Sequence, residues 1–427
     1  MFGNADLSDR SGAMRAHCPL RTMLPFFVRF AFARDREAKE KGEDEMKRTK
    51  KRLLAALCAA AMLAGLAACG TGSEPSSSAG SSSAGASVSE PSSQADSTAA
   101  DTITLTDNAG RTVELPYPVE TAAVANRYGS ELIRACGAID RVVAVDLNTA
   151  QDREYWAAFD PGNVIGKGQR ELDYEKIAEL APQVLILPDN GSYEEAEEKL
   201  APFGIKVFVI SGYATADFKN QTENIGKMFG VEEQAKKFYD YFNDKLTYIS
   251  EQLVGQPKRT LYLETTTPYN TPLRGDPFFD MIEFSGAENI FGSDTTAANG
   301  SEIDPEEVVA RNPDCIVKLI TPSEALAGTG LYEPPTRDDF IAAYNELKAR
   351  PGWEDTKAFQ NNDVFFMTQF GHGGASKLVG TMYIAKWLYP DLLPDLDPDE
   401  VFRAWMEDFQ GFRNIEGHFY CAEELLG

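Results

Sequence analysis

The sequence predicts an α/β protein with two Rossmann-like lobes, each built on a central sheet, joined by a single long α-helix. Three observations lead to this prediction. From Thr102 onward, short β-rich runs alternate with helical stretches, which is typical of α/β sheets. A sequence unit recurs in the two halves of this region, and an amphipathic stretch lies between them. We expect a first lobe at 102–214, an inter-lobe helix at 215–255 and a second lobe at 256–427.

The strand candidates are β-branched or apolar runs bounded by Gly, Pro or Asn, a pattern typical of buried parallel strands. Their alternation with helical stretches favours parallel sheets covered by helices. The candidates are 121–125, 142–146, 184–187, 207–211, 260–264, 315–320 and 364–367.

The repeated unit begins with an aspartate that can cap a helix. Residues 172–177 lead to a proline and a buried-strand pattern, and residues 303–308 lead to the same features at a constant offset of 131. Asp173 and Asp304 occupy equivalent positions and can each N-cap a helix that stops before the proline. Any two αβ units look somewhat alike, but the constant offset favours a true pseudo-repeat.

One helix is expected between the two halves. Starting at Glu232 it would run for about 22 residues, or roughly 33 Å. A helix of this length between two lobes would act as a strut and limit hinge closure. Spacings of three and four residues place its apolar positions on one face, and these positions are Ala235, Phe238, Phe242, Leu246, Ile249 and Leu253.

Charge and cysteine content exclude several classes of protein. Without residues 1–68, which carry 13 Lys/Arg and 8 Asp/Glu, the chain has 28 cations and 58 anions, a net charge of −30. Such a surface repels nucleic-acid phosphates and anionic headgroups, although acidity also simply keeps an exported protein soluble. Six cysteines without a CxxC pair exclude a dense disulfide framework and a zinc site. Cys136 and Cys315 lie in apolar contexts and are expected to be buried.

The N-terminal region predicts export. Residues 46–68 contain a basic segment, an apolar run and small residues in the order of a secretory signal peptide, and Cys69 follows as in a bacterial lipobox. The apolar run is short for a membrane span, so we expect Cys69 to carry lipid chains rather than follow an uncleaved helix. Residues 1–45 are interpreted as a mis-assigned start or a disordered extension. Residues 69–101, rich in Ser, Ala and Gly, are expected to form a flexible tether.

The region from Thr102 to Gly427 resembles the iron-siderophore, haem and cobalamin class of periplasmic-type binding proteins. The resemblance rests on the order of several short motifs together with the lipobox and the strut. They are the opening segment Asp107-Asn108-Ala109-Gly110-Arg111 with Leu115-Pro116, Gly137-Ala138 before Val142, both Glu…Pro…strand units, Pro351-Gly352-Trp353 and Asn362-Asp363-Val364-Phe365.

The resemblance implies a lipid-anchored monomer on the outer face of the cytoplasmic membrane that serves an ABC permease and its ATPase. In that family a glutamate on each lobe pairs with arginines of the permease, and Glu175 and Glu306 match these positions. Two fixed anions would orient the approach. Each glutamate could instead only favour a helix dipole.

The ligand is expected in a cleft between the lobes, because ligands of α/β sheets bind beyond the carboxyl ends of the strands. Arginine in such a cleft can bind carboxylate or catecholate oxygens with two hydrogen bonds, and tyrosines offer flat faces to a chelate, although each tyrosine alone could be packing. The candidate ligand-binding residues are Asn126, Arg127, Tyr128, Asn190, Tyr193 and Tyr213 in the first lobe, and Tyr269, Arg274, Gln369 and His372 in the second. His372 could complete an iron coordination sphere, or it could be a structural hydrogen-bonding residue.

The sequence favours solute binding over three other functions. An enzyme is disfavoured because no catalytic Ser/His/Asp set or phosphate loop is present. A free-metal binder would need more histidines or converging carboxylates. A structural adhesin or sensor partner would not need the paired glutamates. No cofactor is expected, and the ligand is expected to be an iron chelate: a ferric siderophore first, then haem or cobalamin, with an oxyanion such as molybdate as a further alternative.

Overall fold

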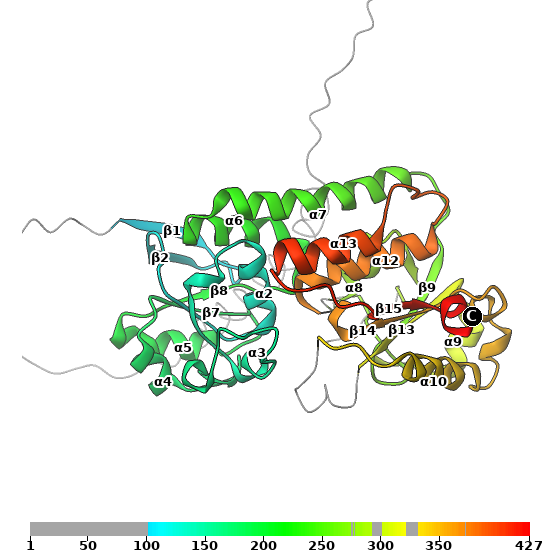
Figure 1. The fold of residues 1–427 in the computed structure, drawn as a ribbon, viewed down its shortest axis with the longest axis horizontal. Coiled ribbons are helices and arrows are strands. Elements are labelled where there is room, and N and C mark those ends of the chain that lie inside the picture. Colours follow the sequence, from blue (N-terminus) through cyan, green and yellow to red (C-terminus); the bar gives the residue numbers. More distant parts are fainter. Residues whose placement is uncertain (1–100, 275, 277, 293–300, 322–331, 372) are drawn as a thin grey trace, which may run out of the picture.

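The computed structural model describes residues 101–274, 276, 278–292, 301–321, 332–371 and 373–427 (Figure 1). The predicted extension, signal peptide, Cys69 and tether up to residue 100 lie outside the described residues, as does His372. Within the described ranges, no helix has both the length and the apolar character needed to cross a bilayer.

The first lobe contains a four-stranded parallel sheet in the order β4-β3-β7-β8. Its strands are β3 (Ala122–Val124), β4 (Val142–Val145), β7 (Val184–Leu187) and β8 (Lys206–Val209). The side chains of β3 and β7 are entirely buried, because helices cover both faces of a parallel sheet.

The second lobe contains the order β11-β9-β13-β14-β15. These strands are β9 (Thr260–Glu264), β11 (Glu288–Asn289), β13 (Cys315–Ile320), β14 (Val364–Thr368) and β15 (Phe419–Cys421). The strand β15 is antiparallel to β14 and adds an edge to an otherwise parallel sheet. All seven predicted strands are present within two residues of their expected ends, while the two-residue β11 and the edge strand β15 were not predicted.

The two sheets confirm the pseudo-repeat, because β4-β3-β7-β8 and β11-β9-β13-β14 have the same order and direction. The side chain of Asp173 accepts a hydrogen bond from the Lys176 amide (2.9 Å) at the start of α4 (Tyr174–Leu180). Asp304 accepts one from the Glu306 amide (2.9 Å) at the start of α9 (Pro305–Arg311). Both helices end at a left-handed residue directly before the predicted proline.

The remaining elements cover these sheets. Two small antiparallel pairs lie in the first lobe and one in the second. Both free cysteines predicted to be buried are buried. The elements are β1 (Thr102–Thr106), β2 (Thr112–Pro116), β5 (Gly166–Gly168), β6 (Glu171–Leu172), β10 (Asn270–Thr271), β12 (Ser301–Glu302), α2 (Arg127–Ala135), α3 (Leu147–Ala150), α5 (Tyr193–Leu200), α8 (Phe279–Phe284), α10 (Arg337–Lys348), α11 (Lys357–Gln360), α12 (Lys377–Leu388), α13 (Pro398–Ala404) and α14 (Ala422–Leu426).

The predicted strut is α7 (Glu232–Gln252), which has 21 residues and runs along one side of the molecule from the first lobe to the second (Figure 1). It follows α6 (Phe218–Phe229), from which it is separated by a left-handed Gly230. The predicted apolar face is buried from Ala235 to Ile249. The ring of Phe238 lies 5.3 Å from Phe218 of α6 and 5.0 Å from Phe409 of the second lobe. The strut therefore shares one apolar core with both lobes.

Candidate functional site

The two lobes meet at the carboxyl ends of their strands. Tyr128, just after β3, packs against Gly373 and Gly374, which follow β14. A Cβ atom added to Gly373 would lie 2.7 Å from Cε1 of Tyr128, and Gly374 has a φ of +61°. Side chains at these two positions would push the lobes apart or strain the backbone. The structure thus brings together two of the loops that were predicted to face each other.

A chain of amides crosses the strand ends of the first lobe. Asn126 caps α2, because its Oδ1 accepts hydrogen bonds from the backbone amides of Tyr128 (2.9 Å) and Gly129 (3.3 Å). Its Nδ2 donates to Oε1 of Gln169 (3.1 Å), and Nε2 of Gln169 donates to Oδ1 of Asn190 (3.4 Å). Asn126 therefore shapes the site, while Gln169, which sequence reasoning missed, links the two predicted asparagines.

Two of the predicted tyrosines pack against each other. Tyr128 and Tyr213 meet edge to face with ring centroids 6.4 Å apart. The Tyr213 hydroxyl donates to Oδ1 of Asp189 (2.6 Å), which fixes its orientation. Tyr193 lies elsewhere: its ring is 4.9 Å from the guanidinium of Arg111, in the turn of the β1–β2 hairpin.

Arg127 is a cation that lies against Tyr128. Its guanidinium lies 4.8 Å from the Tyr128 ring centre, and its side chain is 17% exposed to solvent. Nε of Arg127 is 3.9 Å from Oε1 of Glu131 and donates no hydrogen bond within the described residues. Burial alone would lower the pKa of Arg127, but Tyr128, Tyr332, Glu131 and Asp146, in decreasing order of effect, outweigh this and raise it. The arginine therefore keeps its charge.

Glu131 and Asp146 are two buried carboxylic acids beside Arg127, each about 1% exposed. Burial raises the pKa of Asp146 to about 6, against the opposing effects of Thr149 and Arg127. Burial also raises the pKa of Glu131, although Arg127 and the Tyr332 hydroxyl act in the other direction. Neither residue was predicted from the sequence, because an acidic residue beside a strand or on a helix is usually solvated.

An aromatic junction next to Glu131 also holds the lobes together. Tyr332 of the second lobe donates its hydroxyl to Oε1 of Glu131 (2.6 Å) and stacks on Tyr155 of the first lobe at 3.6 Å. The Tyr155 hydroxyl donates to Oε1 of Gln410 (2.9 Å), whose Nε2 donates to the Glu131 carbonyl (3.0 Å). Separating the lobes would expose this buried network, so the junction opposes their separation.

Two of the predicted residues of the second lobe, Tyr269 and Arg274, are engaged within that lobe. Tyr269 lies 4.3 Å from the Arg350 guanidinium. Arg274 pairs with Glu283 (3.5 Å), donates to the Gly292 carbonyl (3.0 Å) and lines a pocket of about 630 Å³ beside β11. Among the described residues, no hydrogen bond, ion pair or ring contact joins Tyr269 or Arg274 to Tyr128. Gln369 begins the turn after β14.

The other histidine of the folded region, His418, is buried and structural. Its Nδ1 is 2.7 Å from the Thr368 hydroxyl, and its Nε2 is 3.1 Å from the Tyr332 carbonyl. Burial lowers the pKa of His418 to about 4, so the ring is neutral at ordinary pH. In the part of the chain that the structure describes, no group of three or more His, Cys, Asp or Glu side chains could hold a metal ion.

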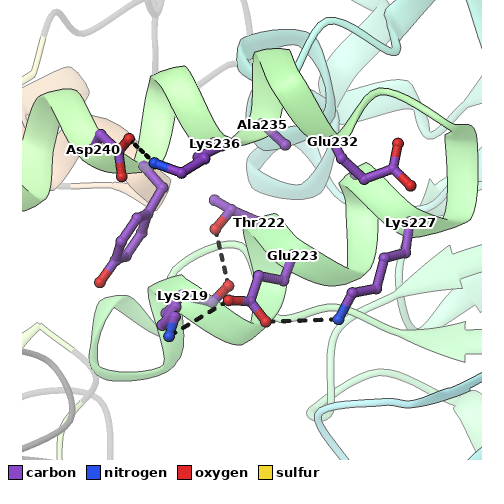
Figure 2. Close-up of a pocket in the computed structure, with 10 residues that line it drawn as sticks. Lys219, Thr222, Glu223, Lys227, Glu232, Ala235, Lys236 and Asp240 are labelled. Carbon is purple, nitrogen blue, oxygen red and sulfur yellow. Dashed lines mark hydrogen bonds and ion pairs between the residues drawn. The ribbon is translucent and has the colours of Figure 1, made fainter. Parts of the chain in front are cut away.

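A second hollow, of about 410 Å³, lies between α6 and α7 (Figure 2). Its rim carries ion pairs of Glu223 with Lys219 (3.5 Å) and Lys227 (3.7 Å), and of Lys236 with Asp240. These charges satisfy one another, and the hollow belongs to the strut rather than to the strand ends. We therefore place the candidate site at Tyr128 and Arg127.

Glu175 and Glu306 are both exposed and occupy matching positions in the first turns of α4 and α9. In a parallel αβ unit the helix runs opposite to the strands, so its first turn lies at their carboxyl edge. The two glutamates therefore lie at the same edge of each sheet as the candidate ligand loops.

The comparisons with known proteins agree with this architecture. A profile of the periplasmic binding protein family matches residues 123–369. The vitamin B12-binding protein of Photorhabdus laumondii is 24% identical over 182 residues, which cover 42% of this chain and 66% of the relative. The protein of the same name from Vibrio vulnificus CMCP6 is 22% identical over 218 residues, covering 51% of this chain and 76% of the relative.

Solved structures show the same fold. The TroA-like periplasmic binding protein FepB of Veillonella parvula matches with a TM-score of 0.63 and 24% identity over 75% of this chain and 99% of its own. The molybdate-binding protein MolA of Haemophilus influenzae matches with a TM-score of 0.56 and 17% identity over 73% of this chain and 98% of its own. These likenesses establish the two-lobed fold and leave the ligand to be argued from the site.

Proposed function

Because this chain belongs to the periplasmic binding protein family, we propose that it is the solute-binding component of an ABC importer and captures a ferric siderophore. The family is a class of solute-binding proteins that act outside the cytoplasm. The observation that supports the proposal is the meeting of two matching lobes at Tyr128 and Gly373, with a charged arginine alongside. An iron chelate would be held there and delivered to the permease.

The chemistry of the strand ends favours a chelate with anionic oxygens. Arg127 is a partly exposed cation in a strongly acidic body, and a guanidinium binds carboxylate or catecholate oxygens well. The ring of Tyr128 lies against this guanidinium, and the buried Tyr213 packs edge to face on Tyr128. Cobalamin is the second candidate, because the two relatives above are named for it; haem and molybdate are further alternatives.

Titration of the purified protein with a ligand panel tests the function. The panel contains a ferric tris-catecholate, a ferric hydroxamate, haem, cobalamin and molybdate. We expect submicromolar quenching of tryptophan fluorescence by a ferric chelate, because Trp156 lies in the lobe junction, with its Nε1 3.3 Å from the Tyr332 hydroxyl. A Trp156→Phe control should lose much of the signal but still retain the chelate in equilibrium dialysis. Saturable binding solely to an unrelated small solute would refute the proposal.

We also propose that the protein is exported and anchored by lipid at Cys69 to the outer face of the cytoplasmic membrane. Two or more acyl chains anchor a protein firmly, whereas one gives marginal binding. Cys69→Ser is therefore expected to move the protein from the membrane fraction to the medium, as measured by immunoblotting of both fractions. A Cys58→Ser variant, which changes the other cysteine of the same segment, should remain on the membrane. Membrane retention of Cys69→Ser would argue against the anchor.

A further inference from the structure

Building on the proposed function, we propose that the ligand binds as an anion at Arg127 and that Glu131 and Asp146 together take up a proton when it binds. The ligand class is therefore an iron chelate that carries carboxylate or catecholate oxygens. Its recognition would depend on two buried acids as well as on the arginine, and the proton would come from the surrounding buffer.

The positions of these three groups provide the geometric basis. Arg127 and Glu131 lie one turn apart on α2, with Nε and Oε1 separated by 3.9 Å, which is too long for a hydrogen bond. Within the described residues, Nε of Arg127 and Oε2 of Glu131 have no hydrogen-bond partner. That oxygen lies 3.1 Å from where a Cβ of Gly374 would be, so it is directed toward the loop of the opposite lobe. An unpaired donor and an unpaired acceptor thus lie at the same lobe junction.

Glu131 and Asp146 each interact with charged or titratable groups of the described residues. Glu131 interacts with Arg127 and Arg134 on its own helix and with Tyr332 of the second lobe, and Tyr155 also lies within electrostatic range of it. Asp146, directly after β4, interacts with Thr149 and with Arg127. Arg127 therefore interacts with both buried acids, while Arg134 interacts with Glu131 alone of the two and stacks on Tyr155 and Trp156.

A ligand anion at Arg127 changes this balance. A new negative charge close to a carboxylate raises the pKa of that carboxylate. Because burial has already raised the pKa of Asp146 to about 6, a modest further increase brings it into the neutral range. Proton uptake and anion binding then favour each other, since the coupling between two bound species is reciprocal. Affinity should rise as the pH falls from about 8 toward 6, by at most about tenfold per pH unit for one proton, and level off below the pKa of the free protein.

Calorimetry on the wild-type protein provides a test that needs no variant. The ferric tris-catecholate of the panel is titrated at about pH 7 in two buffers with different ionisation enthalpies. A difference in the observed enthalpy proportional to the difference between the buffers is expected, with the sign of proton uptake. Equal enthalpies in the two buffers, or proton release, would overturn the inference.

Variants assign the proton to the two acids. Fluorescence titrations across about pH 6 to 8 are compared for the wild type, Asp146→Asn, Glu131→Gln and the double variant, after thermal unfolding has shown that each is folded. The double variant should lose the pH dependence that the wild type shows, whereas Glu198→Gln, a change at an exposed carboxylate on α5, should keep it. Any proton that the chelate itself binds is common to all variants and cancels.

The outcomes separate this inference from the proposed function. If no chelate binds at any pH, the proposed function fails and the inference fails with it. If a chelate binds but the double variant keeps the wild-type pH dependence, the solute-binding function stands and the role of Glu131 and Asp146 is refuted.

Discussion

Replacing Glu264 with alanine is expected to lower the free energy of unfolding by about 3 to 5 kcal/mol, because it removes the buried counter-charge that two buried cations share. Glu264 ends β9, and its side chain is fully buried. Its two oxygens accept hydrogen bonds from Nη1 (2.7 Å) and Nη2 (3.0 Å) of Arg350. Nζ of Lys318 donates to Oε1 at 2.8 Å. Both cations are less than 10% exposed.

The Glu264 cluster, which consists of Glu264, Arg350 and Lys318, predicts an acid-dependent loss of stability. Burial alone would raise the pKa of Glu264, but the hydrogen bonds and charges of Arg350 and Lys318 outweigh it and lower this pKa below its ordinary value of 4.5. A carboxylate with a depressed folded-state pKa stabilises the protein above its unfolded-state pKa, and this contribution disappears as the pH falls through the folded-state pKa. Urea unfolding of the wild type should therefore show this stabilisation at neutral pH and lose it progressively below about pH 4.5.

Glu346 provides the matched control, because it is a second carboxylate on the same arginine. It pairs with Nε of Arg350 at 2.9 Å but remains 54% exposed. Solvent-exposed pairs contribute about 0 to 1 kcal/mol, so Glu346→Ala should have a small effect in the same urea experiment. If the two variants were equally stable, burial would not be what makes the Glu264 cluster important.

The Glu264 cluster also positions a segment of functional interest. The Tyr269 amide donates to Oε2 of Glu264 (2.9 Å), and the Tyr269 carbonyl accepts from the Ile303 amide (2.9 Å). Ile303 directly precedes Asp304, the cap of α9. The buried ion cluster is therefore connected through two hydrogen bonds to the start of the helix that carries Glu306. Tyr269 follows a strand, but its backbone is held within the second lobe by these two hydrogen bonds.

The sheets and the strut could be predicted because their signals are local. Runs such as 184–187 and 315–320 are apolar and bounded by turn residues, and the caps Asp173 and Asp304 each act on an amide two or three residues away. The face of α7 follows from spacing alone. These features depend little on what the rest of the chain does, and the structure confirms them.

The candidate site was predicted less completely, because its contacts join distant parts of the chain. Glu131 and Tyr332 are 201 residues apart, and no local pattern marks either of them as a partner. The direction of a side chain after a strand is also not encoded locally: Arg274 follows β9 as expected, yet it turns to Glu283 on α8. Sequence reasoning located the loops, whereas tertiary packing decided which of their side chains meet.

Replacing both Glu175 and Glu306 with alanine is expected to abolish ligand uptake by cells while leaving ligand affinity unchanged. Both residues are exposed in the first turns of α4 and α9. Neither carboxylate forms a hydrogen bond or an ion pair with another described side chain. Stability should therefore change little. Fixed anions on two lobes held by a strut would set both the spacing and the direction of approach to a cationic permease surface, and such charges affect association more than folding.

The matched control is the pair Glu179→Ala and Glu307→Ala, which also removes one negative charge from each of the same two helices. These glutamates pair with Lys176 (3.1 Å) and Arg311 (3.1 Å) on their own helices, so their charge is already partly balanced. Uptake of a radiolabelled iron chelate is measured in cells, and affinity by fluorescence titration of the purified variants. If docking uses the unpaired carboxylates of Glu175 and Glu306, only the Glu175/Glu306 pair should stop uptake. Equal loss in both pairs would indicate that overall acidity guides the encounter, and normal uptake in the Glu175/Glu306 variant would show that the permease binds another surface.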